Sequence, residues 1–148
     1  MLLNTMLFNS EAWHSFDQNQ VKAFEKIDEA LIRGIVIGHS KIPVPALFLE
    51  TGQVPIRFLL ACRRILYLQT ILQRNPEELI LRVYTAQKNE PVAGDFYQLV
   101  QNYFQLLGLQ LSEECLTSIS KYDLKALLKS SAKKRSLPIF DFNKGNKI

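Results

Sequence analysis

The sequence predicts an all-α domain of about six to seven helices whose connections are marked by proline and glycine. Two observations carry this prediction. Apolar residues recur at helical spacing in several separate segments of the 148-residue chain. Residue types that start or stop helices flank most of these segments. With 47% hydrophobic and 22% charged residues, the chain has the composition of a globular protein with a packed core. We expect one helical domain over residues 1–135 and a basic, flexible tail over 136–148.

The first predicted helix begins after Asp17 and runs toward Gly38, which is a plausible stop. Gln20 lies three residues after Asp17, as in a capping box. The apolar positions that follow helical spacing are Val21, Phe24, Ile27 with Asp28, Leu31 and Ile35. We therefore expect this helix to bury that face.

Prolines place the next two predicted helices. Pro45 can open a short helix over 46–51, and Gly52 closes it. Pro55 is the expected first residue of a helix that runs to about Arg74. Apolar residues occupy a wide arc of this second helix, which is the pattern of a central helix with several neighbours.

Capping signals mark the helices of the C-terminal half. Asn75, Pro76 and the acids Glu77 and Glu78 predict a helix start, and that helix should end near Lys88. The remaining predicted helices cover 96–107, capped by Asp95 and stopped by Gly108, then about 112–119, and finally 121–134, with Pro138 as a stop.

The positive charge of the chain lies at one end. The net charge is +4, yet residues 121–148 hold eight basic and two acidic residues, whereas residues 1–120 hold ten basic and twelve acidic residues. Four lysines recur every four residues, so they form one stripe on a helix, which we call the lysine stripe: Lys121, Lys125, Lys129 and Lys133. Lys134 and Arg135 extend this basic cluster. Contact with a nucleic-acid backbone and a solvated helix end are both open interpretations.

Arginines on the predicted helix after Pro55 form a second candidate surface. Arg57 and Arg64 are seven residues apart and should share a helix face, with Arg63 displaced by one position. These three side chains are candidates for phosphate contacts. The alternative is that they are solvated and pair with nearby acids.

No catalytic centre is predicted. The two histidines and two cysteines, His14, His39, Cys62 and Cys115, have no metal-ligand spacing, and no two aspartates are adjacent as a two-metal site would favour. Acid pairs at 77–78 and 113–114 are explained by the positive ends of helices. We expect no enzyme activity, no metal, no cofactor and no small-molecule substrate.

The sequence also predicts where the chain is found. The N-terminal segment lacks the basic start and cleavage site of a signal peptide, and no apolar run has the length of a membrane span. We expect an intracellular monomer, nuclear or cytoplasmic, without a membrane partner. The apolar start of the chain is typical of a fragment of something longer.

Several short phrases occur together in a recognisable order: SEAW (10–13), FEKID (24–28), HSKIP (39–43), LETG (49–52), PIRF (55–58), RRILYL (63–68) and PVAGDF (91–96). In this order the chain resembles, over residues 8–130, the helical segment that follows the reverse transcriptase core in non-LTR (LINE-like) retrotransposon proteins. The resemblance implies a thumb-like region that holds template and primer through their backbones. Arg57, Arg63 and Arg64 match this role by charge alone. The palm aspartates of the family have no counterpart here, so no catalytic residue is carried over.

Together these observations predict a non-catalytic helical module, derived from a retroelement polyprotein, that contacts nucleic-acid backbone. The alternative is a helical interaction or scaffold domain, or a decayed fragment, with no nucleic-acid role. The response of binding to salt distinguishes the two.

Overall fold

The structure is a computed structural model that describes residues 7–10, 18–37 and 43–136. These residues form seven helices and no strand, if a π-helical turn is counted with the helix that it continues. The all-α prediction is therefore confirmed. In chain order the elements are α2 (Gln18–Ile32) with its continuation η1 (Arg33–Ile37), α3 (Val44–Thr51), α4 (Ile56–Leu72), α5 (Leu79–Asn89), α6 (Phe96–Leu107), α7 (Glu113–Ser118) and α8 (Lys121–Ser136).

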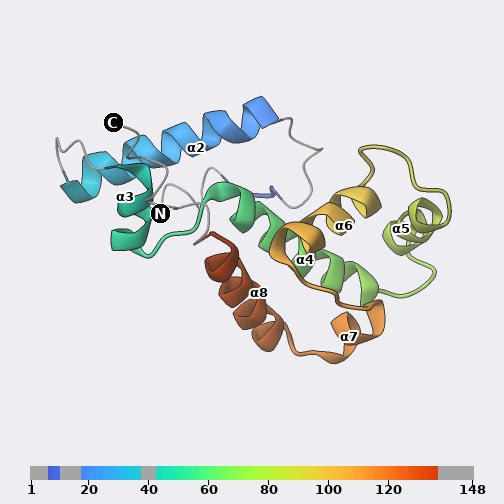
Figure 1. Cartoon of the computed structure of the whole chain (residues 1–148). Coiled ribbons are helices and arrows are strands. Elements are labelled where there is room, and N and C mark those ends of the chain that lie inside the picture. Colours follow the sequence, from blue (N-terminus) through green and yellow to red (C-terminus); the bar gives the residue numbers. More distant parts are fainter. Residues whose placement is uncertain (1–6, 11–17, 38–42, 137–148) are drawn as a thin grey trace.

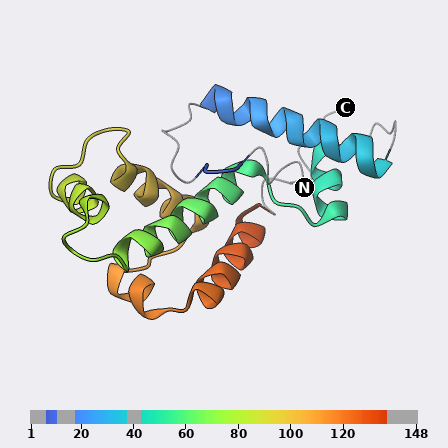
Figure 2. The ribbon, with the colours of Figure 1, turned by 180° about the vertical axis from the view of Figure 1, so that it is seen from behind.

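Helix α4 lies at the centre of the molecule, as its wide apolar arc predicts. Helices α6 and α8 pack along it, α5 and α7 lie near its C-terminal end, and α2 and α3 lie near its N-terminal end (Figures 1 and 2). The main core joins α4 to α6 and α8 through fully or almost fully buried side chains, among them Phe58, Ile65, Leu68, Val100, Leu124 and Leu128. Burying one such side chain stabilises the fold by about 1.5–3 kcal/mol.

The predicted boundaries of α6 are confirmed. Asp95 Oδ1 accepts a hydrogen bond of 2.8 Å from the backbone N–H of Gln98, so it satisfies one of the unpaired donors at the helix start. Gly108 ends the helix with φ 64°, in the left-handed region that favours glycine. Gly52 ends α3 in the same way, with φ 63°.

Helix α8 is a continuous helix through Ser136, two residues beyond the predicted end. Ser120 Oγ accepts from the backbone N–H of Asp123 at 3.1 Å and donates to the Asp123 carboxylate at 2.7 Å, which fixes the first turn. Because Ser130 and Ser131 do not interrupt the helix, Lys133 remains in helical register with the rest of the lysine stripe. The predicted tail over 136–148 lies outside the described residues except for Ser136, which is the buried last residue of α8.

The predicted helix start at Asn75 is wrong. Asn75 Oδ1 accepts from the backbone N–H of Glu77 at 3.1 Å, and the Glu78 N–H bonds the Asn75 carbonyl at 2.9 Å. Because the Asn75 side chain and carbonyl close a turn with the two glutamates, Asn75 does not cap a helix. Helix α5 begins only at Leu79, with Glu78 at the N-cap position. Glu77 and Glu78 therefore precede the helix instead of lying in its first turn.

The start of α4 and the buried face of α2 also differ from the prediction. Pro55 is the residue before α4 and not its first helical residue. On α2 the buried side chains are Asp28 and Ile32, whereas Ile27 and Ile35 are exposed, so the buried face is rotated from the predicted one. The proposed cap at Asp17 and stop at Gly38 lie outside the described residues.

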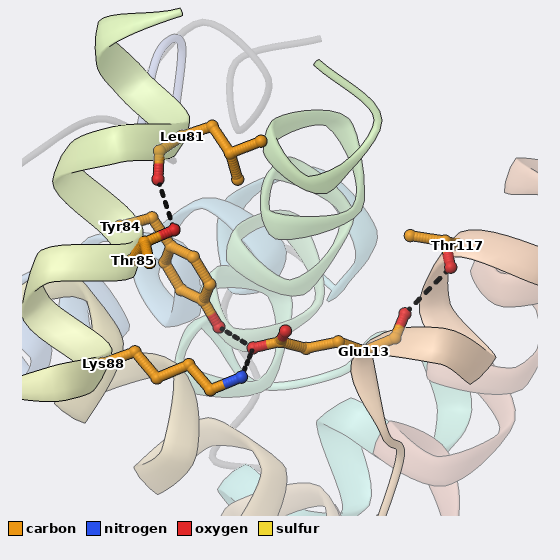
Figure 3. A network of polar contacts seen from close by, with 6 residues as sticks. All are labelled: Leu81, Tyr84, Thr85, Lys88, Glu113 and Thr117. Atoms are coloured by element: carbon orange, nitrogen blue, oxygen red, sulfur yellow. Dashed lines mark hydrogen bonds and ion pairs between the residues drawn. The ribbon is translucent and has the colours of Figure 1, made fainter. Parts of the chain in front are cut away.

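A polar network holds α5 against α7 (Figure 3). The Tyr84 hydroxyl donates to Glu113 Oε1 at 3.1 Å, and Lys88 Nζ lies 3.0 Å from the same oxygen. Burial and the Glu113 carboxylate raise the pKa of Tyr84, so the hydroxyl stays protonated and remains a donor at neutral pH. Glu113 is thus fixed in a structural role.

Candidate functional site

The lysine stripe lies along one exposed face of α8. All four side chains are exposed, while Leu124 and Leu128, each one position before a stripe lysine, are fully buried. With a rise of 1.5 Å per residue, successive lysines are about 6 Å apart along the axis, and the first and last are about 18 Å apart. The helix therefore holds four ammonium groups in one line.

A groove runs between α4 and α8 beside this stripe. Its larger hollow, of about 680 Å³, is lined by Gly52, Gln53, Val54, Leu59, Cys62, Arg63, Leu66, Lys125, Leu128, Lys129, Ala132 and Lys133. A second hollow, of about 210 Å³, is lined by Arg63, Leu66, Tyr67, Thr70 and Lys121. Because the two hollows share Arg63 and Leu66, they adjoin, and we treat them together as the α4–α8 groove.

The charges around the α4–α8 groove all have the same sign. Each of the four stripe lysines lines one hollow or the other, and Arg63 lines both. Among the described residues that line the groove there is no aspartate or glutamate. The structure thus brings five cationic side chains from two helices, distant in sequence, around one concave surface.

Arg63 is the predicted arginine that reaches this groove. Its guanidinium donates a hydrogen bond of 2.7 Å to the backbone carbonyl of Leu7, and its side chain is half-buried. A fixed guanidinium at the junction of the two hollows is well placed to meet an anion, because less side-chain entropy remains to be lost.

Arg57 lies elsewhere. Its Nε donates to Glu25 Oε1 at 2.8 Å and its Nη2 to Glu25 Oε2 at 3.1 Å, a bidentate pair that links α4 to α2. The hydrogen bond to Glu25 raises the pKa of Arg57. Arg57 therefore pairs with a nearby acid, which was the alternative to phosphate contact. It lies outside the α4–α8 groove.

Arg64 is fully buried, so the expectation that it contacts phosphate does not hold in this structure. Its Nε donates to the Ser10 carbonyl at 3.4 Å and its Nη1 to the Tyr103 hydroxyl at 3.1 Å, with the Tyr103 ring centre 5.5 Å from its Cζ. Burial lowers its pKa. Seven-residue spacing placed Arg64 on one face with Arg57, but α6 packs over that part of α4.

The two remaining predicted basic residues do not line the groove. Lys134 is exposed on another side of α8. The Arg135 guanidinium lies against the Cα of Gly108, where it occupies the space that a side chain at position 108 would need. Its positive charge there lies at the C-terminal end of α6, where the helix dipole favours cations.

The α4 residues that form the wall of the groove were not predicted from the sequence. Leu59, Leu66 and Tyr67 line it, and Tyr67 is the aromatic residue of the second hollow. The position of Tyr67 was partly predictable, because it follows Arg63 by four residues and shares its face of the helix. The sequence does not show which face of α4 meets α8.

Cys62 also lines the groove and behaves as a structural thiol. Its Sγ lies 3.6 Å from the carbonyl oxygen of Leu128, and burial raises its pKa to about 11. At neutral pH the nucleophilic thiolate is therefore scarce.

Among the described residues, no three His, Cys, Asp or Glu side chains are grouped to hold a metal ion.

No helix within the described residues combines the length and apolar character of a membrane span.

A scan against protein-family models, a search of curated proteins and a search of solved structures found no match to this chain. The resemblance to non-LTR retrotransposon proteins therefore stays a prediction.

Proposed function

We propose that this chain binds the phosphate backbone of nucleic acid in the α4–α8 groove. The observation that carries the proposal is the gathering of Arg63 and the four stripe lysines around one groove whose described lining holds no acid. Phosphate contacts position a nucleic acid without reading its sequence. We therefore expect binding that does not depend on base sequence.

The energetics of the lysine stripe support a polyanionic partner. Like charges at four-residue spacing repel by about 0.2–0.5 kcal/mol per pair on an isolated helix. The stripe contains three such pairs, so α8 is less stable with the lysines than without them. A polyanion removes this repulsion and releases its own counterions on binding.

The salt dependence of binding tests the proposal. If four phosphates of a duplex are neutralised, the slope of log K against log salt is about −3.6, and for a single strand it is about −2.8. We expect the stripe variant, in which all four stripe lysines become glutamine, to lose most of this slope. Glutamine and lysine have similar helix propensities, so circular dichroism should remain unchanged.

A matched control separates the groove from net charge. The control variant removes the same number of charges at exposed positions that do not line the groove: Lys22→Gln, Lys26→Gln, Arg82→Gln and Lys134→Gln. We expect it to keep the slope of the natural protein. If the two variants lose affinity and slope equally, the chain binds through overall charge and the groove is not the site.

We propose further that this module binds without catalysing a reaction, in keeping with its resemblance to a segment outside the polymerase core. The proposal predicts no magnesium-dependent primer extension by the purified chain. Extension that is abolished by one aspartate substitution would overturn it. A nuclear or cytoplasmic location also stays a prediction.

A helical interaction domain is the second candidate function. Exposed apolar side chains on α5 and the following loop favour it: Leu79 is 74% exposed, Val83 46% and Val92 66%. Exposed apolar patches are typical of protein contacts. If the natural protein shows no salt-dependent binding of polyanions, this candidate replaces the first.

A further inference from the structure

Building on the proposed function, we infer that the α4–α8 groove takes a single nucleic-acid strand in preference to a duplex, with phosphates along the lysine stripe and bases against the α4 wall. Three features of the groove carry this inference: its width, its apolar lining and the position of Tyr67.

The width of the groove favours a thin ligand. The groove is the depression between two packed helices, whose axes typically lie about 8–10 Å apart. A duplex is a stiff cylinder wider than this spacing, so it can touch the rims but cannot enter. A single strand is flexible and narrow enough to lie in hollows of about 680 and 210 Å³.

The lining of the groove is apolar between its cations. Leu59 and Leu66 on α4 line the larger hollow and are partly exposed, whereas Leu128 and Ala132 on α8 also line it but are almost fully buried. The outer surface of a duplex is phosphate and sugar, and it offers no apolar face to this lining. A single strand exposes unstacked bases, whose faces can cover the leucines while its phosphates stay at the lysine rim.

Tyr67 supplies an aromatic surface in the second hollow, beside Arg63 and Lys121. Its ring packs edge-to-face with Phe96, at 5.9 Å between ring centres and 84° between planes, which holds it in place. A basic groove with a fixed aromatic ring is the arrangement by which proteins bind single strands without sequence preference.

The length of the stripe sets the size of the site. Four lysines spread over about 18 Å of helix axis. With one phosphate per lysine, the groove takes about four nucleotides, the lower end of the range known for single-strand modules. Oligonucleotides of about four nucleotides should therefore already bind. Longer ones should gain affinity mainly because they offer more four-nucleotide segments that can occupy the groove.

The first experiment compares strands and duplexes by fluorescence anisotropy at one salt concentration. The probes are an oligothymidylate of about 12 nucleotides and a mixed-sequence duplex of the same length. We expect the single strand to bind at least about tenfold more tightly, since stacking of even one base contributes about that factor. Poly-dA and poly-dC strands should bind within a few-fold of it.

Two tyrosine variants locate the stacking surface. Tyr67→Leu keeps an apolar side chain in the hollow but removes the ring, and we expect about a tenfold loss of single-strand affinity with an unchanged salt slope. Tyr122→Leu is the control, because Tyr122 is 82% exposed on α8 and lines neither hollow. Circular dichroism and unfolding in urea verify that both variants fold.

The two cysteines provide an independent readout without substitution. Cys62 lines the groove, whereas Cys115 is exposed on α7. At alkaline pH, where more of the Cys62 thiol is ionised despite its raised pKa, we expect oligothymidylate to slow alkylation of Cys62 by iodoacetamide several-fold and to leave alkylation of Cys115 unchanged. The duplex should protect neither thiol.

The outcomes separate this inference from the proposed function. If the duplex binds as tightly as the single strand, and Tyr67→Leu and Cys62 alkylation show no effect, the single-strand inference is overturned and backbone binding stands. If neither probe binds with a salt slope that the stripe variant removes, the proposed function itself fails.

Discussion

At the scale of single residues, burial separates Arg63 from Arg64 although they are neighbours in the chain. A helix turns by about 100° per residue, so adjacent side chains point in different directions. Arg63 points to the groove between α4 and α8, and Arg64 points between α4 and α6. One lines the groove and the other holds the core together.

We predict that Arg64→Ala lowers the free energy of unfolding by about 3 kcal/mol, because it leaves the Tyr103 hydroxyl and the Ser10 carbonyl without their buried donor. Unfolding in urea measures this loss. Arg82→Ala, at an exposed position, should change stability by less than about 0.5 kcal/mol. A loss equally small at position 64 would contradict the structural role.

Asp28 is a second residue whose environment opposes its charge. It is 3% exposed, its Oδ2 has no hydrogen-bond partner among the residues that the structure describes, and burial raises its pKa above the ordinary 3.8. The folded state therefore favours the protonated carboxyl. As the pH rises from the unfolded pKa through the higher folded pKa, the unfolded state loses its proton first and stability falls.

We predict that Asp28→Asn removes the loss of folding stability that the natural protein suffers as the pH rises. The amide has a similar shape to the carboxyl group and carries no charge. The variant should be more stable than the natural protein at pH 7, and the difference should shrink toward pH 3. Urea titrations at several pH values provide the measurement, with exposed Glu90→Gln as the control. A variant that is less stable at pH 7 would show that the carboxylate is ionised and stabilising.

At the scale of elements, local side-chain chemistry decides how much the sequence predicts. Asp95 and Gly108 bound α6 as expected, because a cap and a positive φ depend on few neighbouring residues. Asn75 shows the limit of the same logic. Its side chain can cap a helix or close a turn, and the sequence pattern is the same for both.

Helix α5 illustrates an element held by a contact that the sequence does not show. It buries Tyr84, whose hydroxyl reaches Glu113 at the start of α7, 29 residues later (Figure 3). From the sequence, the helix dipole alone accounts for Glu113. The structure adds a buried phenol and Lys88 as partners of the same carboxylate.

We predict that Tyr84→Phe lowers the free energy of unfolding by about 1–2 kcal/mol, because a hydrogen bond to a charged group is lost while the ring packing remains. Tyr122→Phe, at a position that is 82% exposed, serves as the control and should lie within about 0.5 kcal/mol of the natural protein. Equal stability of both variants would show that Lys88 alone holds Glu113.

At the scale of the whole molecule, the groove depends on packing between distant segments. The lysine stripe was predictable, since four-residue spacing on one helix fixes it. The wall formed by Leu59, Leu66 and Tyr67 was not, because α4 precedes α8 by about 50 residues and has several apolar faces. Only the tertiary contact of α4 with α8 turns a charged helix face into a concave site.

Under the proposed function, the lysine stripe lowers the stability of α8 but favours binding, so the two effects oppose each other. Three like-charge pairs on α8, each worth about 0.2–0.5 kcal/mol, give a total of about 1 kcal/mol at low salt. We predict that the stripe variant is more stable than the natural protein by about this amount. The gain should disappear at about 1 M salt, where the screening length is about 3 Å.

A bound ligand should make the natural protein more stable than the stripe variant, which reverses their order in the free state. A partner at about 100 times its Kd stabilises the folded state by about 2.7 kcal/mol, which exceeds the repulsion within the stripe. Oligonucleotide should therefore raise the melting temperature of the natural protein above that of the stripe variant, which lacks the site. Thermal unfolding of both proteins, with and without oligothymidylate, measures this crossing. If the variant is not more stable when free, and oligonucleotide shifts both melting temperatures equally, the lysines of α8 are a solvated helix face.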